Sequence, residues 1–211
     1  MSIKTYSRKK DGAVKLSENF RVREFACNDG SVTVKIDLDN VKQLQKIRDH
    51  FGKSITITSG YRTAAYNASP KVGGAKNSYH VKGQAADIVV SGISPLKVYL
   101  YADSIGVKGA IYYPNSRFCH IDTRPGRYRA ITLDGKTFYA EPTTTLKQGS
   151  SGGSVKWLQL MLGYAGYKLT ADGKYGPGTK LAVKDFQRKC GLTVDGVAGT
   201  KTIAKLKEVL M

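Results

Sequence analysis

The chain has 211 residues, 41% of them apolar, which is enough for one large globular domain or two small ones. Its formal net charge of +18 favours association with a polyanion such as nucleic acid, an anionic membrane or an anionic cell wall. No apolar run could span a bilayer and the amino terminus lacks the apolar region of a secretory signal, so we expect a soluble protein without a signal peptide and without stable membrane insertion. The three scattered cysteines support neither a disulfide framework nor a cysteine zinc site.

The first part of the chain combines helical and strand patterns. Apolar residues at helical spacing predict a helix that is capped by Asp39 or Asn40 and continues to Phe51. Alternating β-branched residues predict a strand over residues 55–58, and the loop that follows this strand carries Arg62.

The next elements indicate antiparallel pairing. Ser94 and Pro95 begin a helix that runs to Ile105, because serine caps a helix and proline suits its first turn. Strand patterns occur over residues 85–90, 109–113, 118–123, 128–133 and 136–139, and the last two are joined by Asp134-Gly135, a strong hairpin signal. Because most connections are too short for repeated βαβ crossovers, we predict an α+β domain with a small antiparallel sheet flanked by helices.

Composition predicts a first domain over residues 1–140, a linker over 141–153 and a second domain over 154–211. The second domain contains an internal repeat: Asp172-Gly173, Gly176 and Thr179 recur at a fixed offset as Asp195-Gly196, Gly199 and Thr202. An amphipathic helix follows each copy, and we expect the threonines to start these helices. With a first helix from Ser154 to Leu162, the pattern predicts a bundle of three helices.

Two of the three histidines lie in strand or turn contexts that suit a metal site. Strand alternation places His120 and Asp122 on one face, with Cys119 and Ile121 on the other. His80 and Asp87 flank a turn and the start of the next strand. We therefore predict that His80, Asp87 and His120 form an open zinc site, with three protein ligands and one position left for water.

Three further residues complete this hypothesis or limit it. Asp122 is the candidate catalytic carboxylate, which either accepts a proton from the water or orients a ligand histidine. Arg62 is the candidate anchor for a substrate carboxylate, because a guanidinium binds a carboxylate in a bidentate manner. His50, at the end of the first helix, is not expected to bind metal. The alternative is that these are hydrogen-bonded core groups, with Asp122 paired to Arg124 and Arg62 at the surface.

The motifs Ser59-Gly60-Tyr61-Arg62, Ser78-x-His80-x-x-Gly83-x-Ala85-x-Asp87 and His120-x-Asp122 resemble those of the zinc D-alanyl-D-alanine carboxypeptidase-like peptidases of bacteria and their phages. The resemblance implies zinc ligands at His80, Asp87 and His120 and binding of a substrate carboxylate by Arg62 and Ser78. Several branches of that family have a catalytic Glu or Asp three residues before the last histidine, where this chain has Arg117. Asp122 is therefore nominated as the catalytic residue partly by elimination.

The second domain resembles the peptidoglycan-binding module of cell-wall hydrolases, through motifs that include Val155-x-x-Leu158-Gln159 and the repeat described above. Together the two resemblances imply a zinc-dependent peptidase of the endolysin type. Such an enzyme hydrolyses a stem or cross-bridge peptide of the bacterial cell wall, and its binding module holds it on peptidoglycan. We expect a monomer that acts at the wall. The alternatives are a catalytically inactive wall-binding protein and, less favoured because no recognition motif is present, a nucleic-acid binder.

Overall fold

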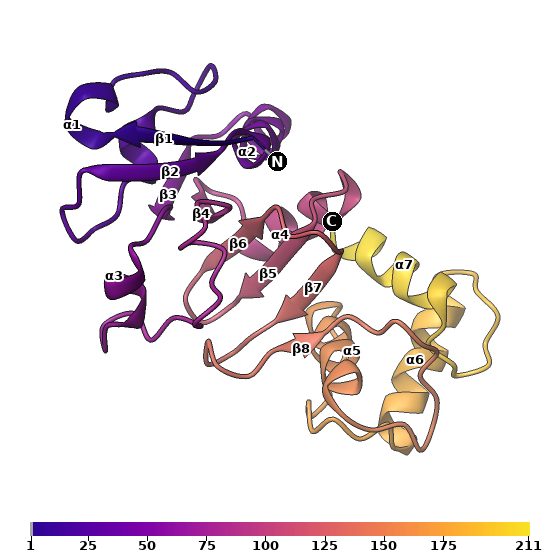
Figure 1. Ribbon diagram of the computed structural model, residues 1–211. Coiled ribbons are helices and arrows are strands. Elements are labelled where there is room, and N and C mark those ends of the chain that lie inside the picture. Colours follow the sequence, from indigo (N-terminus) through magenta and orange to yellow (C-terminus); the bar gives the residue numbers. More distant parts are fainter. Residues whose placement is uncertain (1) are drawn as a thin grey trace. The chain divides into compact units, whose positions relative to one another are not determined.

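A computed structural model of the chain describes residues 2–211 and shows the mixed α+β fold predicted from the sequence (Figure 1). Its strands are β1 (Ile3–Ser7), β2 (Thr33–Asp37), β3 (Ile55–Ser59), β4 (Ala85–Val90), β5 (Gly109–Tyr113), β6 (Phe118–Asp122), β7 (Tyr128–Ile131) and β8 (Tyr139–Ala140). Its helices are α1 (Arg8–Asp11), the 3-10 helix η1 (Val22–Phe25), α2 (Leu38–Phe51), α3 (Ala64–Ala68), α4 (Pro95–Ser104), α5 (Gly153–Tyr164), α6 (Pro177–Lys189) and α7 (Thr200–Leu210).

The contacts divide the chain into two compact units, and the division falls between Tyr128 and Arg129. The domain boundaries at residues 140 and 154, which rest on composition, stay a prediction. The structure adds that residues 141–153 are not extended away from the helices that follow. Isolated β-bridges join Leu146 to Ala198 and Ser151 to Lys174.

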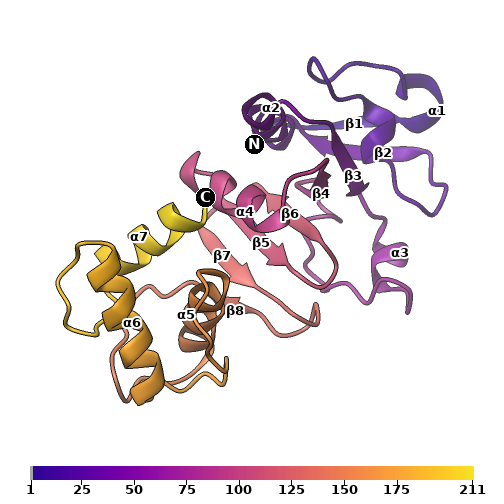
Figure 2. The same cartoon turned by 180° about the vertical axis from the view of Figure 1, so that it is seen from behind.

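The first unit is built on an antiparallel sheet in which four strands have the order β3-β4-β6-β5. Helix α4 packs on β4, β5 and β6, and α2 contacts α4 and β4 (Figure 2). The side chains of Ile88, Cys119 and Ile121 are almost fully buried in this core, with exposed fractions of 1% or less. Strand alternation therefore turns the intervening side chains of β4 and β6 to the opposite face, where the candidate site lies.

Helix α4 begins as the sequence predicted, whereas the start of α2 needs a correction. Ser94 caps α4, because its hydroxyl accepts a hydrogen bond from the backbone N–H of Lys97. The N-cap of α2 is Asp37, and not Asp39 or Asn40, because the Asp37 carboxylate accepts the N–H of Asp39. Asp37 also accepts a 2.6 Å hydrogen bond from the Thr123 hydroxyl, so this cap joins α2 to the end of β6.

The amino-terminal segment adds a small second sheet. Strands β1 and β2 pair antiparallel, with Ile3 opposite Asp37, and these strands were not predicted from the sequence. Phe20, Val22 and Phe25 are buried in and next to η1, with exposed fractions of 3% or less. This segment packs against β2 and β3.

The second unit starts with a strand pair that differs in length from the prediction. Strand β7 ends at Ile131, and β8 contains only Tyr139 and Ala140. The reason lies at Asp134, whose carboxylate accepts the backbone N–H groups of Lys136 and Thr137. These bonds make residues 132–138 a wide loop in place of the two-residue hairpin that Asp-Gly usually forms.

Helices α5, α6 and α7 complete the second unit, and the internal repeat is visible in their connections. Gln159 on α5 donates to Asp172 and Thr179, and Gln187 on α6 makes the equivalent bonds. The Gln187 amide donates to Asp195, Thr202 and the Val197 carbonyl, and accepts from the Gly196 N–H.

This arrangement corrects the role expected of the repeated threonines. Thr179 and Thr202 lie inside the first turns of α6 and α7, which are preceded by Gly176 and Gly199 as N-caps. Both threonines are buried and accept hydrogen bonds from the glutamine amides instead of capping the helices.

In the part of the chain that the structure describes, no helix is long and apolar enough to cross a membrane.

Candidate active site

The register of β4 against β6 brings the site together. Asp87 lies directly opposite His120, and Ala85 lies opposite Asp122. His80 reaches the same place from the turn before β4. That turn closes at Gly83, whose φ of +73° favours glycine and whose missing side chain lets the backbone of Lys35 approach.

The three predicted ligands converge on one point. His80 Nε2 lies 3.1 Å from His120 Nδ1 and 3.2 Å from Asp87 Oδ1, and the last two atoms are 2.8 Å apart. All three side chains are buried. Among residues 2–211, this is the group of histidine, cysteine and acidic side chains that offers three ligand atoms within 4.8 Å of one another.

His80 is held with one ring nitrogen facing the other two ligand atoms. Its Nδ1 donates to the Gly60 carbonyl at 2.7 Å, which directs Nε2 toward Asp87 and His120. Burial lowers the pKa of His80 below its ordinary value, although the nearby Asp87 charge opposes this shift. The side chain is therefore neutral at pH 7, which is the form that binds a metal.

Asp87 is shared between the site and a guanidinium. Its Oδ1 faces the two histidines, and its Oδ2 accepts a 2.7 Å hydrogen bond from Nη2 of Arg62. Burial by itself would raise the pKa of Asp87, but the electrostatic interaction with the neighbouring His80 ring and the hydrogen bonds from both histidines hold it well below the ordinary value. Asp87 is therefore ionised at every physiological pH.

His120 lies between two carboxylates. Its Nδ1 faces Asp87, and its Nε2 is 3.0 Å from Oδ2 of Asp122. Burial lowers the pKa of His120, whereas the hydrogen bonds to Asp122 and Asp87 raise it, and the net result is a pKa of about 9. In this geometry Asp122 contacts Nε2 of His120, the ring nitrogen that points away from Asp87 and His80.

Asp122 is fully buried and is fixed by Arg124, which the sequence suggested only as an alternative partner. Arg124 Nε donates to both carboxylate oxygens at 2.8 and 3.0 Å, its Nη2 makes a further short bond, and its backbone N–H donates to Oδ1. The guanidinium lies over the rings of Tyr79 and Tyr128, 4.9 and 4.4 Å from their centroids. No spacing rule in the sequence pointed to these two tyrosines.

Gly109 is a second residue to which no sequence pattern pointed. It lies opposite Asp122 on the neighbouring strand β5. A Cβ atom at this position would lie 2.1 Å from Asp122 Oδ1, so the carboxylate occupies the space that a side chain would need. A glycine facing an acidic residue across an antiparallel pair is the only signal that could have found it, and that pairing is not visible before the strand register is known.

The other predicted residues are placed as follows. Arg62 touches Asp87 and donates through Nε to the Ser59 hydroxyl at 2.8 Å. Ser78 lies two residues from His80 and accepts the His80 backbone N–H at 3.3 Å. Arg117 lies in the turn between β5 and β6, exposed and with a φ of +56°. His50 stacks on Tyr101 with ring centroids 3.7 Å apart and is not part of the cluster.

The donor set suits zinc. Two imidazoles and one carboxylate are typical ligands of a catalytic zinc ion, and tetrahedral ligands at about 2.0–2.1 Å are roughly 3.3 Å apart. The sides of the triangle formed by His80, Asp87 and His120 measure 2.8 to 3.2 Å, so small movements would give this spacing. The free ring nitrogens of both histidines have hydrogen-bond acceptors, which is the usual support for metal-binding histidines.

Comparison with known proteins gives matches to both parts of the chain. Residues 18–122 match the family Peptidase M15, and residues 151–206 match the family described as a putative peptidoglycan binding domain. The first match contains all six site residues predicted from the sequence, whereas Arg124 and Tyr128 lie just beyond it. The second contains both copies of the internal repeat.

Parts of the chain are similar to a peptidoglycan endopeptidase and to a zinc carboxypeptidase. The chain is 38% identical over 99 residues to the probable peptidoglycan L,D-endopeptidase MepK of Haemophilus influenzae, a match that covers 44% of this chain and 53% of that protein. It is 46% identical over 68 residues to the zinc D-Ala-D-Ala carboxypeptidase of Streptomyces albus G, which covers 31% of this chain and 27% of that protein. The chain thus spans about half or less of the length of these relatives.

Among solved structures, the Burkholderia AP3 phage endolysin shares 44% identity over 30% of this chain and 24% of its own, with a TM-score of 0.30. The SleB N-terminal domain shares 41% identity over 33% of this chain and 97% of its own, with a TM-score of 0.32. By the two family matches, residues 18–122 are a Peptidase M15 family domain and residues 151–206 are a putative peptidoglycan binding domain.

Proposed function

We propose that the protein is a zinc-dependent peptidoglycan peptidase, of the kind found in endolysins, that hydrolyses a stem or cross-bridge peptide of the bacterial cell wall. The observation that carries the proposal is the convergence of His80, Asp87 and His120 on one point, with sides of 2.8 to 3.2 Å. The membership of residues 18–122 in a peptidase family supports it. The relatives named as a probable peptidoglycan L,D-endopeptidase and as a zinc D-Ala-D-Ala carboxypeptidase support the substrate class.

The residues of this chain divide the work. His80, Asp87 and His120 would hold zinc, which lowers the pKa of a coordinated water to about 7 and polarises a carbonyl group. Asp122, for which the sequence left two roles open, is assigned the role of orienting His120, because its carboxylate contacts the ring nitrogen that faces away from the other ligands.

Arg62 and Ser78 are proposed to bind a substrate carboxylate. Two of the N–H groups of Arg62 are used by Asp87 and Ser59, and a guanidinium has five. The remaining N–H groups lie next to the metal ligands, so a carboxylate bound there would place its neighbouring peptide bond close to the site. Ser78 is half-buried beside His80 and would add a hydroxyl donor.

The carboxy-terminal unit is proposed to keep the enzyme on its polymer. Tethering raises the effective concentration of substrate without new contacts at the active site. The net charge of +18 suits an anionic wall. All the proposed site residues lie in the first unit, and we propose that the protein acts as a monomer.

The test is digestion of purified sacculi by the zinc-loaded protein and by His80→Ala. We expect new amino groups with the wild type only, and loss of this activity with a chelator. Mass spectrometry of the released muropeptides separates the two reaction types: loss of a terminal D-alanine alone indicates a carboxypeptidase, and separation of cross-linked or internal peptides indicates an endopeptidase. Equal amino-group release by both proteins contradicts the proposal.

A catalytically inactive wall-binding protein is the second candidate, and one observation favours it. The position three residues before His120 is the exposed Arg117, and Asp122 is committed to His120 and Arg124. This candidate predicts binding to sacculi without amino-group release at any zinc concentration. A nucleic-acid binder predicts instead that DNA retains the protein more strongly than sacculi do, with strong salt dependence.

A further inference from the structure

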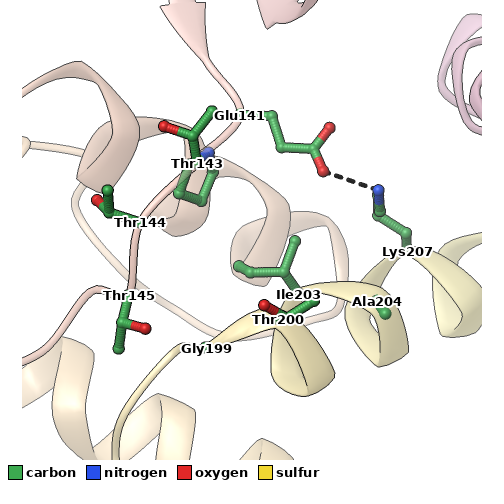
Figure 3. A pocket seen from close by; sticks show the side chains of 10 residues that line it. Glu141, Thr143, Thr144, Thr145, Gly199, Thr200, Ile203, Ala204 and Lys207 are labelled. Carbon is green, nitrogen blue, oxygen red and sulfur yellow. Dashed lines mark hydrogen bonds and ion pairs between the residues drawn. The ribbon is translucent and has the colours of Figure 1, made fainter. Parts of the chain in front are cut away.

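The second unit contains a pocket of about 250 Å³ beside α7 (Figure 3). One wall is the extended segment 141–145, and the other is one face of α7 with Gly199, Thr200, Ile203, Ala204 and Lys207. The volume is below the roughly 300–1,000 Å³ of sites for drug-sized molecules, so it suits a ligand the size of one sugar unit or one amino acid.

The pocket is formed before any ligand arrives, because both ends of its extended wall are fixed. At one end, Glu141 donates its backbone N–H to the Arg129 carbonyl at 2.9 Å. At the other end, Leu146 and Ala198 exchange two backbone hydrogen bonds of 3.1 and 2.8 Å. A pre-formed site loses little conformational entropy on binding, which favours recognition even by a few contacts.

The charges in the pocket cancel. Lys207 Nζ lies 2.8 Å from Glu141 Oε1, and the two side chains are only 18% and 9% exposed. Figure 3 shows this pair at one end of the space. A charged ligand would have to compete with the pair for one of its members, so the pocket favours an uncharged ligand.

The rest of the lining combines hydroxyl and methyl groups. Hydroxyl groups come from Thr143, Thr144 and Thr145 on one side and from Thr200 on the other. An apolar surface is formed on α7 by Ile203 and Ala204. None of the lining residues is aromatic. Such a lining suits a ligand that carries hydroxyl groups, an amide and a small apolar group on one compact ring.

We propose that this pocket binds an uncharged N-acetylated amino sugar of a glycan strand, with the sugar hydroxyls and the amide facing the threonines and the acetyl methyl facing Ile203. The inference rests on the proposed function, since it names the part of the wall polymer that the carboxy-terminal unit contacts. It assigns the glycan to this unit and leaves the peptide to the metal site.

The test measures binding of the full chain to peptide-free glycan strands and, separately, to glycan-free stem peptides by isothermal titration. Ala204→Trp fills the pocket from an exposed helix position, and Thr144→Arg places a charge in it from the exposed segment. Leu181→Trp, at an α6 position that is 67% exposed and outside the pocket, is the matched control. Circular dichroism verifies that each variant is folded.

We expect the wild type and Leu181→Trp to bind glycan strands equally, and both pocket variants to bind at least about tenfold more weakly. Unchanged glycan binding by the folded pocket variants overturns the inference, as does wild-type binding to stem peptides but not to glycan. Hydrolysis of soluble muropeptides by the wild type is measured apart from these titrations. Its absence counts against the peptidase and leaves the glycan readout intact.

Discussion

Arg124 offers a sharp test of how the metal site is supported. Its guanidinium makes three bonds to the Asp122 carboxylate, which is fully buried and holds His120 through Nε2. We expect Arg124→Ala to weaken zinc binding by up to about 10-fold, the low end of the roughly 10- to 100-fold usual for losing a direct outer partner of a metal ligand, because Arg124 acts on His120 only through Asp122. Arg124→Lys should fall between this variant and the wild type, because lysine keeps the charge but not the fork of donors.

The same change should lower stability, because it leaves Asp122 without its main partner. Breaking a buried ion pair by removing one member costs about 3–5 kcal/mol. The Arg124 side chain is 18% exposed, and the backbone N–H of residue 124 stays bonded to the carboxylate, so we expect the low end of this range. Chemical denaturation of the metal-free protein measures the free energy of unfolding, and competition with a chromophoric chelator measures zinc affinity.

Arg127→Ala is the matched control. Arg127 also binds an aspartate, Asp103, through two donors, but its side chain is 49% exposed and the pair lies outside the metal site. We expect it to change stability by less than about 1 kcal/mol and to leave zinc affinity unchanged. Equally tight zinc binding by Arg124→Ala and Arg127→Ala would show that Arg124 does not support the proposed ligand His120 through Asp122.

Three further outcomes follow from the geometry. Gly109→Ala should weaken zinc binding and cost about 1–3 kcal/mol of stability, because the added Cβ would lie 2.1 Å from Asp122. Gly126→Ala, which has open space around it, should have neither effect. Equal zinc affinity of the two variants in chelator competition would contradict this prediction. The pKa of His120 is raised to about 9, so protonation of this ring stabilises the metal-free fold fully below pH 6.5, and that stability is lost as the pH rises through 9. Zinc needs the deprotonated ring and should bind more tightly over the same pH range. Denaturation and zinc titration at several pH values test both trends, and a stability and a zinc affinity that change in the same direction with pH would contradict them. Gln187→Ala should destabilise the second unit by roughly 1–3 kcal/mol for each buried group that loses its hydrogen bond, as measured by denaturation. A change below about 0.5 kcal/mol would mean that the repeated glutamine does not stabilise the fold.

Much of the fold followed from local pattern. The alternation in β4 and β6 separated the site face from the core face, and Cys119 and Ile121 are indeed buried on the core side. The Ser94 cap and strands β5 and β6 also lie where their sequence patterns placed them. These features depend on residues close in the chain, so a periodicity or a turn residue is enough to predict them.

Other features depend on partners far apart in the chain. Strands β1 and β2 were missed, because each is short and stabilised mainly by the other. The α2 cap was misplaced by two or three residues, because Asp37 is selected in part by its bond to Thr123, 86 residues away. At Asp134, side-chain bonds to the backbone opened a loop that the Asp-Gly signal alone would have kept tight.

By itself the sequence determined which residue types can form the metal site and which strand face carries them, because alternation and ligand chemistry are local properties. Only the tertiary structure decided how they are supported: the register that sets Asp87 opposite His120, the bond from Arg62 to Asp87, and the space that Gly109 leaves for Asp122. Register and close approach are set by packing across strands, and no single segment of the chain contains that information.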